Sequence, residues 1–279
     1  MASNLVVARG GVEYVPPISL AFWRWFIVFL ILLPFTYQAV LKNIKYLKKE
    51  YKRLFFLGAM GCGVCGAFPF MAGMTTTVAN MGIIYTSSPI FIILISSYFY
   101  KERLNTIQFL GLGLCFVGVV SIIAKGEISL LVSLKFTSGD LWMLGAAIGW
   151  ALYAVLLLNW KSKFNLFSRF TIIAFFGAIS LLPFSLIENY FIRPVVFNDK
   201  FYFWTIFAAI SPGIIALSLY AQAQRYLGAS ITGFTLYLFT VYGAFYGIFI
   251  FGEELKTYHY YGALLVFAGM FFVRKKNNN

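Results

Sequence analysis

The chain has 279 residues, of which 61% are hydrophobic and only 11% are charged. A soluble domain carries about 25% charged residues, so this composition excludes an ordinary soluble protein and indicates a chain solvated mostly by lipid. The net charge of +13 comes from lysines and arginines that cluster between apolar runs. That is the pattern of a multi-pass membrane protein, and it argues against nucleic-acid binding.

Residues 1–8 begin the chain with an apolar stretch that is too short to span a bilayer, which needs about twenty helical residues. We expect this first helix to be truncated at its N-terminus, and a genuine half-helix start is the alternative. A loop follows at 10–17, marked by Gly-Gly and Pro-Pro. Four more spans are predicted, at 18–39, 54–72, 78–100 and 107–124. A basic cluster between the first two of these is predicted to be a cytoplasmic loop, comprising Lys42, Lys45, Lys48, Lys49, Lys52 and Arg53.

The second half repeats this layout after a polar linker at 125–138. Its five spans are predicted at 139–159, 170–190, 201–222, 231–251 and 258–273, and a basic tail follows at 274–279. Counted over the loops, 15 basic residues fall on one side of the membrane and 6 on the other. This asymmetry predicts ten spans with a cytoplasmic C-terminus.

The two halves are related by a constant offset of 151 residues near their ends. Seven residues of the first half recur without a gap: Glu102, Leu104, Thr106, Gly111, Leu114, Phe116 and Gly118 match Glu253, Leu255, Thr257, Gly262, Leu265, Phe267 and Gly269. The repeat predicts a first five-helix unit at 1–124 and a second at 139–273. Because five is odd, tandem copies cross the membrane in opposite senses, which is the inverted repeat of many secondary transporters.

Four motifs carry a resemblance to a known family. Ser3-Asn4 ends the first helix, and Pro16-Pro17 followed by Phe22-Trp23-Arg24 opens the second. Ser88-Pro89 lies in the fourth helix, and a Glu-x-Leu-x-Thr…Gly…Gly tract occurs in both halves. Over essentially its whole length the chain resembles the EamA-type transporters of the drug/metabolite transporter superfamily.

The resemblance implies a ten-helix secondary transporter of small metabolites, often an exporter of amino acids or related compounds. Two features depart from the family pattern. The first helix is incomplete, and Thr240 stands where the second repeat usually carries a proline. The second departure predicts a ninth helix that is straighter than the fourth.

Candidate substrate-binding residues are polar or aromatic side chains within the spans, because such groups in lipid face a cavity or a partner helix. Arg24 is the foremost charge; snorkelling to the outer interface and a structural pairing are the alternatives. Asn4, Trp150 and Tyr153 follow, since Asn4 and Tyr153 are repeat equivalents expected near the axis between the halves. The other candidates are Phe68, Asn80, Tyr85, Ser88, Tyr220, Gln224, Tyr237 and Tyr242.

Pro69 and Pro89 are predicted hinges or kinks in the third and fourth helices. Glu102 and Glu253 are read as helix caps rather than substrate contacts. Cys62 and Cys65 have no histidine or carboxylate nearby, so no metal site is predicted. No cofactor is expected, and the absence of a phosphate-binding loop argues against a nucleotide-driven pump.

The sequence therefore predicts an all-α integral membrane protein, a ten-helix inverted repeat (5+5). Its predicted function is export of small metabolites such as amino acids across the inner (plasma) membrane by alternating access. The predicted partners are a small-molecule substrate and the lipid bilayer. Two alternatives remain open: an inactive fragment or non-transporting scaffold, and an intramembrane lipid-modifying enzyme. The enzyme is disfavoured because no acid pair lies within the spans.

Overall fold

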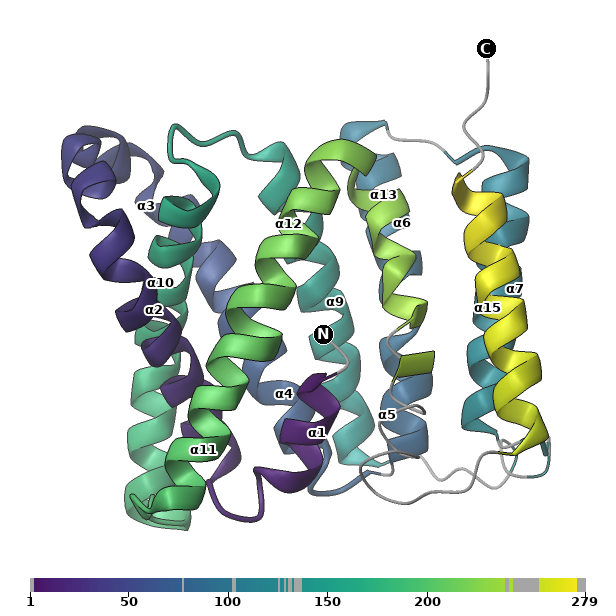
Figure 1. The fold of residues 1–279 in the computed structure, drawn as a ribbon, viewed down its shortest axis with the longest axis horizontal. Coiled ribbons are helices and arrows are strands. Elements are labelled where there is room, and N and C mark those ends of the chain that lie inside the picture. Colours follow the sequence, from purple (N-terminus) through teal and green to yellow (C-terminus); the bar gives the residue numbers. More distant parts are fainter. Residues whose placement is uncertain are drawn as a thin grey trace.

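A computed structural model describes the chain except for residues 1–2, 77, 102–103, 125, 128, 130–131, 133–136, 239–240, 243–255 and 275–279. All regular elements within the described residues are helices. They stand side by side as a bundle, with α1 near its middle and α15 at one edge (Figure 1). The helical fold predicted from composition is confirmed.

The helices of the first half follow the predicted order of spans. They are α1 (Ser3–Gly10), α2 (Pro17–Lys42), α3 (Ile44–Gly58), the π-helical η1 (Ala59–Val64), α4 (Cys65–Ala72), α5 (Val78–Tyr85), α6 (Ser88–Tyr100) and α7 (Thr106–Ile123). Those of the second half are α9 (Ser138–Asn159), α10 (Leu166–Ile187), the π-helical η2 (Glu188–Ile192), α11 (Asp199–Ala208), the π-helical η3 (Ala209–Ile215), α12 (Ala216–Leu227), α13 (Ala229–Gly233) and α15 (Thr257–Arg274).

The outer surface of the bundle is apolar. Within the described part of the chain, six helical runs are long and apolar enough to cross a membrane. Large aromatic side chains point outward, and Phe35, Tyr98 and Tyr190 are each at least 80% exposed. Such a surface is unfavourable in water and suits contact with acyl chains and headgroups. The structure is that of a multi-pass membrane protein.

The third helix begins ten residues earlier than predicted, because α3 starts at Ile44 rather than at 54. The prediction of a basic loop at 42–53 was wrong. Lys45, Lys48, Lys49 and Lys52 are spaced by three or four residues and share one helical face. Leu54 and Leu57 lie buried on the same helix. The basic cluster is therefore the polar side of an amphipathic helix end.

The fourth helix is broken. α5 ends at Tyr85, and α6 begins at Ser88 with Pro89 as its second residue. Two serine hydroxyls bond carbonyls at the break: Ser87 Oγ donates to Ile84 O at 2.5 Å and Ser88 Oγ to Tyr85 O at 2.6 Å. The proline cannot donate a backbone hydrogen bond, which explains why the interruption falls here.

The ninth helix is also interrupted in its described part. α13 ends at Gly233, and a turn follows at Phe234 before the helix resumes. Thr240, the basis for expecting a straighter helix, lies outside the described residues. The interruption thus occurs upstream of the position that the family pattern singled out.

The third and eighth helices each contain a π-helical segment, η1 and η3, flanked by α-helix on both sides. A π-turn holds one residue more than the α-turn that it replaces, and such segments are frequent at functional sites. Their first residues, Ala59 and Ala209, are 150 positions apart. That separation is close to the offset of the sequence repeat, so the two segments occupy equivalent places in the two halves.

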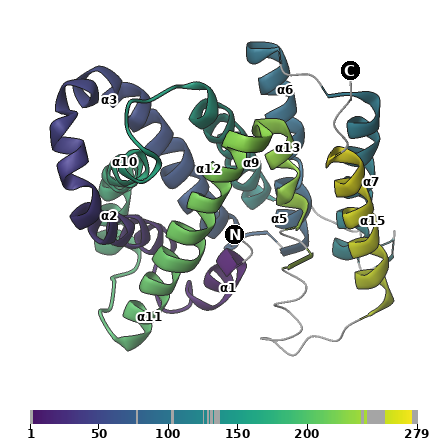
Figure 2. The ribbon, with the colours of Figure 1, turned by 45° about the horizontal axis from the view of Figure 1, so that its top comes forward.

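Two hydrophobic cores hold the bundle together. The larger one joins α2, α3, α4, α9, α10 and α12, and the smaller one joins α7 and α15 to the interrupted fourth and ninth helices. In both views α7 and α15 lie side by side at the edge opposite α2, α3 and α10 (Figures 1 and 2). Close approach depends on glycine: a Cβ at Gly58 would lie 2.7 Å from the backbone of Gly177 on α10.

The start of α2 is capped by a residue from the other half. Glu188 accepts backbone hydrogen bonds from Ile18 at 3.1 Å and Ser19 at 2.7 Å, and α2 has no side-chain cap from its own N-cap residue. We expect Glu188→Ala to destabilise the protein by about 1–3 kcal/mol, because buried N–H groups lose their acceptor. Thermal unfolding in detergent measures this. Glu13→Ala, at an exposed carboxylate, is the matched control and should leave the midpoint unchanged.

Candidate substrate-binding site

Arg24 is enclosed by the bundle although it carries a charge. It lies two turns into α2 and only 4% of its surface is exposed. Its Nη1 donates to Asn4 Oδ1 on α1 at 2.8 Å. The guanidinium carbon lies 4.5 Å from the Trp25 ring centroid and 5.9 Å from that of Phe70. Arg24 therefore does not snorkel to the interface; it points into the protein and pairs with Asn4.

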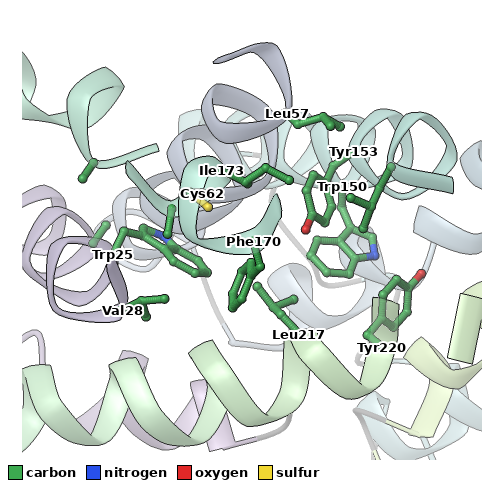
Figure 3. Packing of buried hydrophobic residues seen from close by; sticks show 14 of the residues in the cluster. Trp25, Val28, Leu57, Cys62, Trp150, Tyr153, Phe170, Ile173, Leu217 and Tyr220 are labelled. Atoms are coloured by element: carbon green, nitrogen blue, oxygen red, sulfur yellow. The ribbon is translucent and has the colours of Figure 1, made fainter. Parts of the chain in front are cut away.

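A second group of candidates forms an aromatic cluster from α9 and α12. The ring centroid of Trp150 lies 5.5 Å from Tyr153 and 5.1 Å from Tyr220. All three side chains are buried. Figure 3 shows them together on one side of the packed core, with Trp25 on the other. Their burial amid other helices excludes a place in the aromatic belt at the membrane interface.

The polar atoms of this cluster face each other. The Trp150 indole nitrogen points toward the Tyr220 hydroxyl and the two groups interact (Figure 3). The geometry nevertheless falls short of a hydrogen bond, and each atom is buried with no hydrogen-bond partner among the described residues. A buried polar group without a hydrogen bond destabilises the fold. A ligand that bonds to these two atoms would relieve that cost.

Removing the Tyr220 hydroxyl tests that description. We expect Tyr220→Phe to change the free energy of unfolding by less than about 0.5 kcal/mol, or to raise it slightly, because a poorly satisfied buried group is replaced by hydrogen. Chemical unfolding in detergent is the measurement. Tyr202→Phe, an exposed position on the neighbouring α11, gives the baseline for the same chemical change. A loss of more than about 1.5 kcal/mol at Tyr220 alone would show that the hydroxyl is firmly bonded within the fold.

Tyr85 lies between the two groups. It ends α5 at the break in the fourth helix, and both Tyr220 and Arg24 are among the groups near its side chain. Ser88, on the other side of the break, is buried with its hydroxyl committed to Tyr85 O. The structure thus gathers six candidates into one region: Asn4, Arg24, Tyr85, Trp150, Tyr153 and Tyr220.

Gln224 lies close to this region but holds helices together. It is 1% exposed, and its Nε2 donates to Ala154 O on α9 at 2.9 Å. Its Oε1 is buried without a hydrogen-bond partner in the described part of the chain. The amide therefore fixes α12 against α9 and leaves one acceptor free.

The remaining candidates lie elsewhere. Phe68 packs its ring 4.8 Å from Trp142, Tyr237 belongs to the smaller core, and Tyr242 is 52% exposed on the outside. Asn80 lies on α5, and its side chain is outside the described residues. Pro69 sits within α4 and Pro89 at the start of α6.

Two neighbours of Arg24 are not singled out by the sequence patterns. Trp25 is 2% exposed and its Nε1 has no hydrogen-bond partner within the described residues, while Phe70 is buried against the guanidinium. Trp25 directly follows the Phe22-Trp23-Arg24 motif, so position alone was a usable signal. Nothing in the sequence distinguishes Phe70 from the many packing phenylalanines.

Helices broken in the membrane region around enclosed polar groups are typical of transport proteins. A family model described as the EamA-like transporter family matches residues 1–124 and 137–275. The chain belongs to the EamA-like transporter family, and it is a membrane transporter rather than an enzyme by family.

Individual relatives agree with this assignment. An uncharacterized transporter of Archaeoglobus fulgidus is 26% identical over 280 residues, covering 99% of this chain and 94% of the relative. The uncharacterized transporter YyaM of Bacillus subtilis is 28% identical over 270 residues, covering 95% and 86%. A crystal structure at 17% identity aligns with a TM-score of 0.77 over 98% of this chain and 92% of its own, which shows the shared fold.

Proposed function

We propose that this transporter is a secondary exporter of small metabolites such as amino acids, working by alternating access between two inverted halves. The halves are residues 1–124 and 139–273, and 125–138 is the linker between them. The observation that carries the proposal is a contact between repeat-equivalent residues. Cys115 Sγ lies 3.5 Å from Val266 O, within hydrogen-bonding distance, and these positions are 151 residues apart, the offset of the repeat.

The glycines around that contact support the same symmetry. A Cβ on Gly118 would lie 2.7 Å from Gly262 O, and one on Gly269 would lie 2.6 Å from Gly111 O. Under the offset of 151, Gly111 corresponds to Gly262 and Gly118 to Gly269. Each contact is therefore the image of the other. The contacting residues therefore run in opposite directions along α7 and α15. A two-fold axis in the membrane plane through Cys115 and Val266 requires this arrangement.

The distribution of basic residues supports a cytoplasmic C-terminus, which is the orientation that we propose. The α2–α3 junction, the α9–α10 connection, the α12–α13 junction and the end of α15 all lie along the upper edge in Figure 1. Together with the tail of the sequence at 274–279, these segments carry most of the basic residues of the chain, including the cluster on α3. By the positive-inside rule that edge faces the cytoplasm, with the protein in the inner (plasma) membrane.

Flux measurement tests the proposed activity. The purified protein is reconstituted into liposomes and screened for movement of labelled amino acids, nucleosides and organic cations, against protein-free liposomes. We expect saturable flux for a subset of amino acids, and counterflow when the same solute is loaded inside, as alternating access requires. Absence of flux for every solute would favour the non-transporting scaffold. Flux that does not saturate would contradict alternating access.

A further inference from the structure

Among the described residues, the Arg24 guanidinium has no negatively charged partner. It is 4% exposed, its Nη1 meets only the neutral amide of Asn4, and its Nε has no hydrogen-bond partner among the described residues. An enclosed charge is expensive unless it is paired with an opposite charge. The neighbours of Arg24 within the described part of the chain are all neutral.

The described carboxylates are occupied elsewhere. Three of them are exposed on the surface: Glu13, Glu127 and Asp199. The other three accept hydrogen bonds: Glu50 from Ser162, Asp140 from Thr137, and Glu188 from Ser19. Within the part of the chain that the structure describes, no acid lies within ion-pair reach of Arg24. The counter-charge is therefore expected from a ligand.

We infer that Arg24 and Asn4 form a binding site for the carboxylate of an amphipathic substrate that carries a single carboxylate group. This assignment rests on the proposed transport function and names its substrate class. Guanidinium groups bind carboxylates through charge-assisted hydrogen bonds, and the unpartnered Nε supplies a donor for one. The titratable groups nearest to Arg24 are Cys62, Cys65 and Tyr85, and none of them is a second cation. One positive charge suits a single carboxylate better than a phosphate dianion.

The surroundings select an apolar or aromatic substrate body. Trp25 and Phe70 flank the guanidinium, and Tyr85 links it to the aromatic cluster around Trp150. The Trp150 indole nitrogen and the Tyr220 hydroxyl, which have no hydrogen-bond partner among the described residues, can bind a second polar group on the same molecule. Tyr85 also borders the break between α5 and α6, so the broken helix lies against the site.

An isosteric substitution tests this site without opening a cavity. Asn4→Asp places a protein carboxylate against Arg24, where it occupies the guanidinium and excludes the carboxylate of a ligand. Arg24→Gln removes the charge instead. Asn198→Asp is the matched control, because this N-cap residue of α11 accepts from Phe201 N and aspartate caps equally well.

Binding is measured by thermal unfolding in detergent with four carboxylates: 3-phenylpropanoate, indole-3-acetate, octanoate and L-phenylalanine. The primary amide of each is the paired control. We expect at least one acid to raise the melting temperature of the wild-type protein and of Asn198→Asp, and its amide to have no effect. The apparent affinity for that acid should fall at least about tenfold in both Asn4→Asp and Arg24→Gln.

The site assignment is overturned if no acid binds, if acid and amide bind equally, or if either Asn4→Asp or Arg24→Gln keeps wild-type affinity. Flux measurements on the same variants test the carboxylate site separately from the proposed transport function. Arg24-dependent carboxylate binding without any flux would uphold the site and remove the transport proposal. Flux of neutral or cationic solutes at unchanged rates in both variants would uphold transport and remove the carboxylate site.

Discussion

Replacing Gly118 by valine is expected to cost about 1–3 kcal/mol of stability and to reduce the yield of folded protein. Even a Cβ at this position would lie 2.7 Å from Gly262 O and 2.9 Å from Leu265 Cβ. The first obstacle is backbone and cannot rotate away. The added side chain therefore forces α7 and α15 apart along the contact that we place on the axis between the halves.

Gly113 on the same helix provides the control. A Cβ there meets nothing within 4 Å, and the position is exposed. Gly113→Val should leave stability unchanged or raise it slightly, because glycine is a poor helix former. Unfolding midpoints in detergent for the two variants give the comparison. Equal midpoints would mean that the α7–α15 approach contributes little to the fold.

Replacing Trp150 by alanine should reduce flux at least about tenfold, equivalent to about 1.4 kcal/mol of lost interaction. Its ring contacts Tyr153 and Tyr220, and its nitrogen lacks a hydrogen-bond partner among the described residues. The alanine variant also leaves a cavity, which costs about 3–5 kcal/mol for a buried tryptophan. Trp150→Phe keeps most of the volume and separates the two effects.

The phenylalanine variant should fold and still show reduced flux, because it lacks the indole N–H. Trp142→Ala, at a partly exposed tryptophan earlier on α9, should transport at the wild-type rate. Flux in proteoliposomes is measured for all three variants at equal amounts of folded protein. Wild-type flux in Trp150→Phe and Trp150→Ala would show that the aromatic cluster is packing alone.

Much of the architecture is predictable because it depends on composition and spacing. The apolar runs locate α2, α7, α9, α10 and α15 to within a few residues. The break beside Pro89 follows from the missing backbone donor. The basic stretch before 54 was misread because charge was taken as a loop signal, whereas its spacing of three and four residues is that of a helix face.

The site is less predictable, because it depends on contacts between distant segments. Arg24 was recognisable from its unusual position in an apolar run, but its bond to Asn4 spans the loop at 10–17 and required the packed structure. The same is true of Gln224, whose amide holds α9 rather than standing free. The π-helical segments had no clear signal, since one extra residue in a helix leaves composition and hydrophobicity unchanged.

The paired π-helical segments bear on the history of the chain. An extra residue inserted into one helix after the two halves had diverged would appear in one half only. Here η1 and η3 interrupt equivalent helices near equivalent residues. If the two halves arose by duplication of one unit, a π-helical turn already present in that unit accounts for both copies. The irregularity would then be older than the duplication.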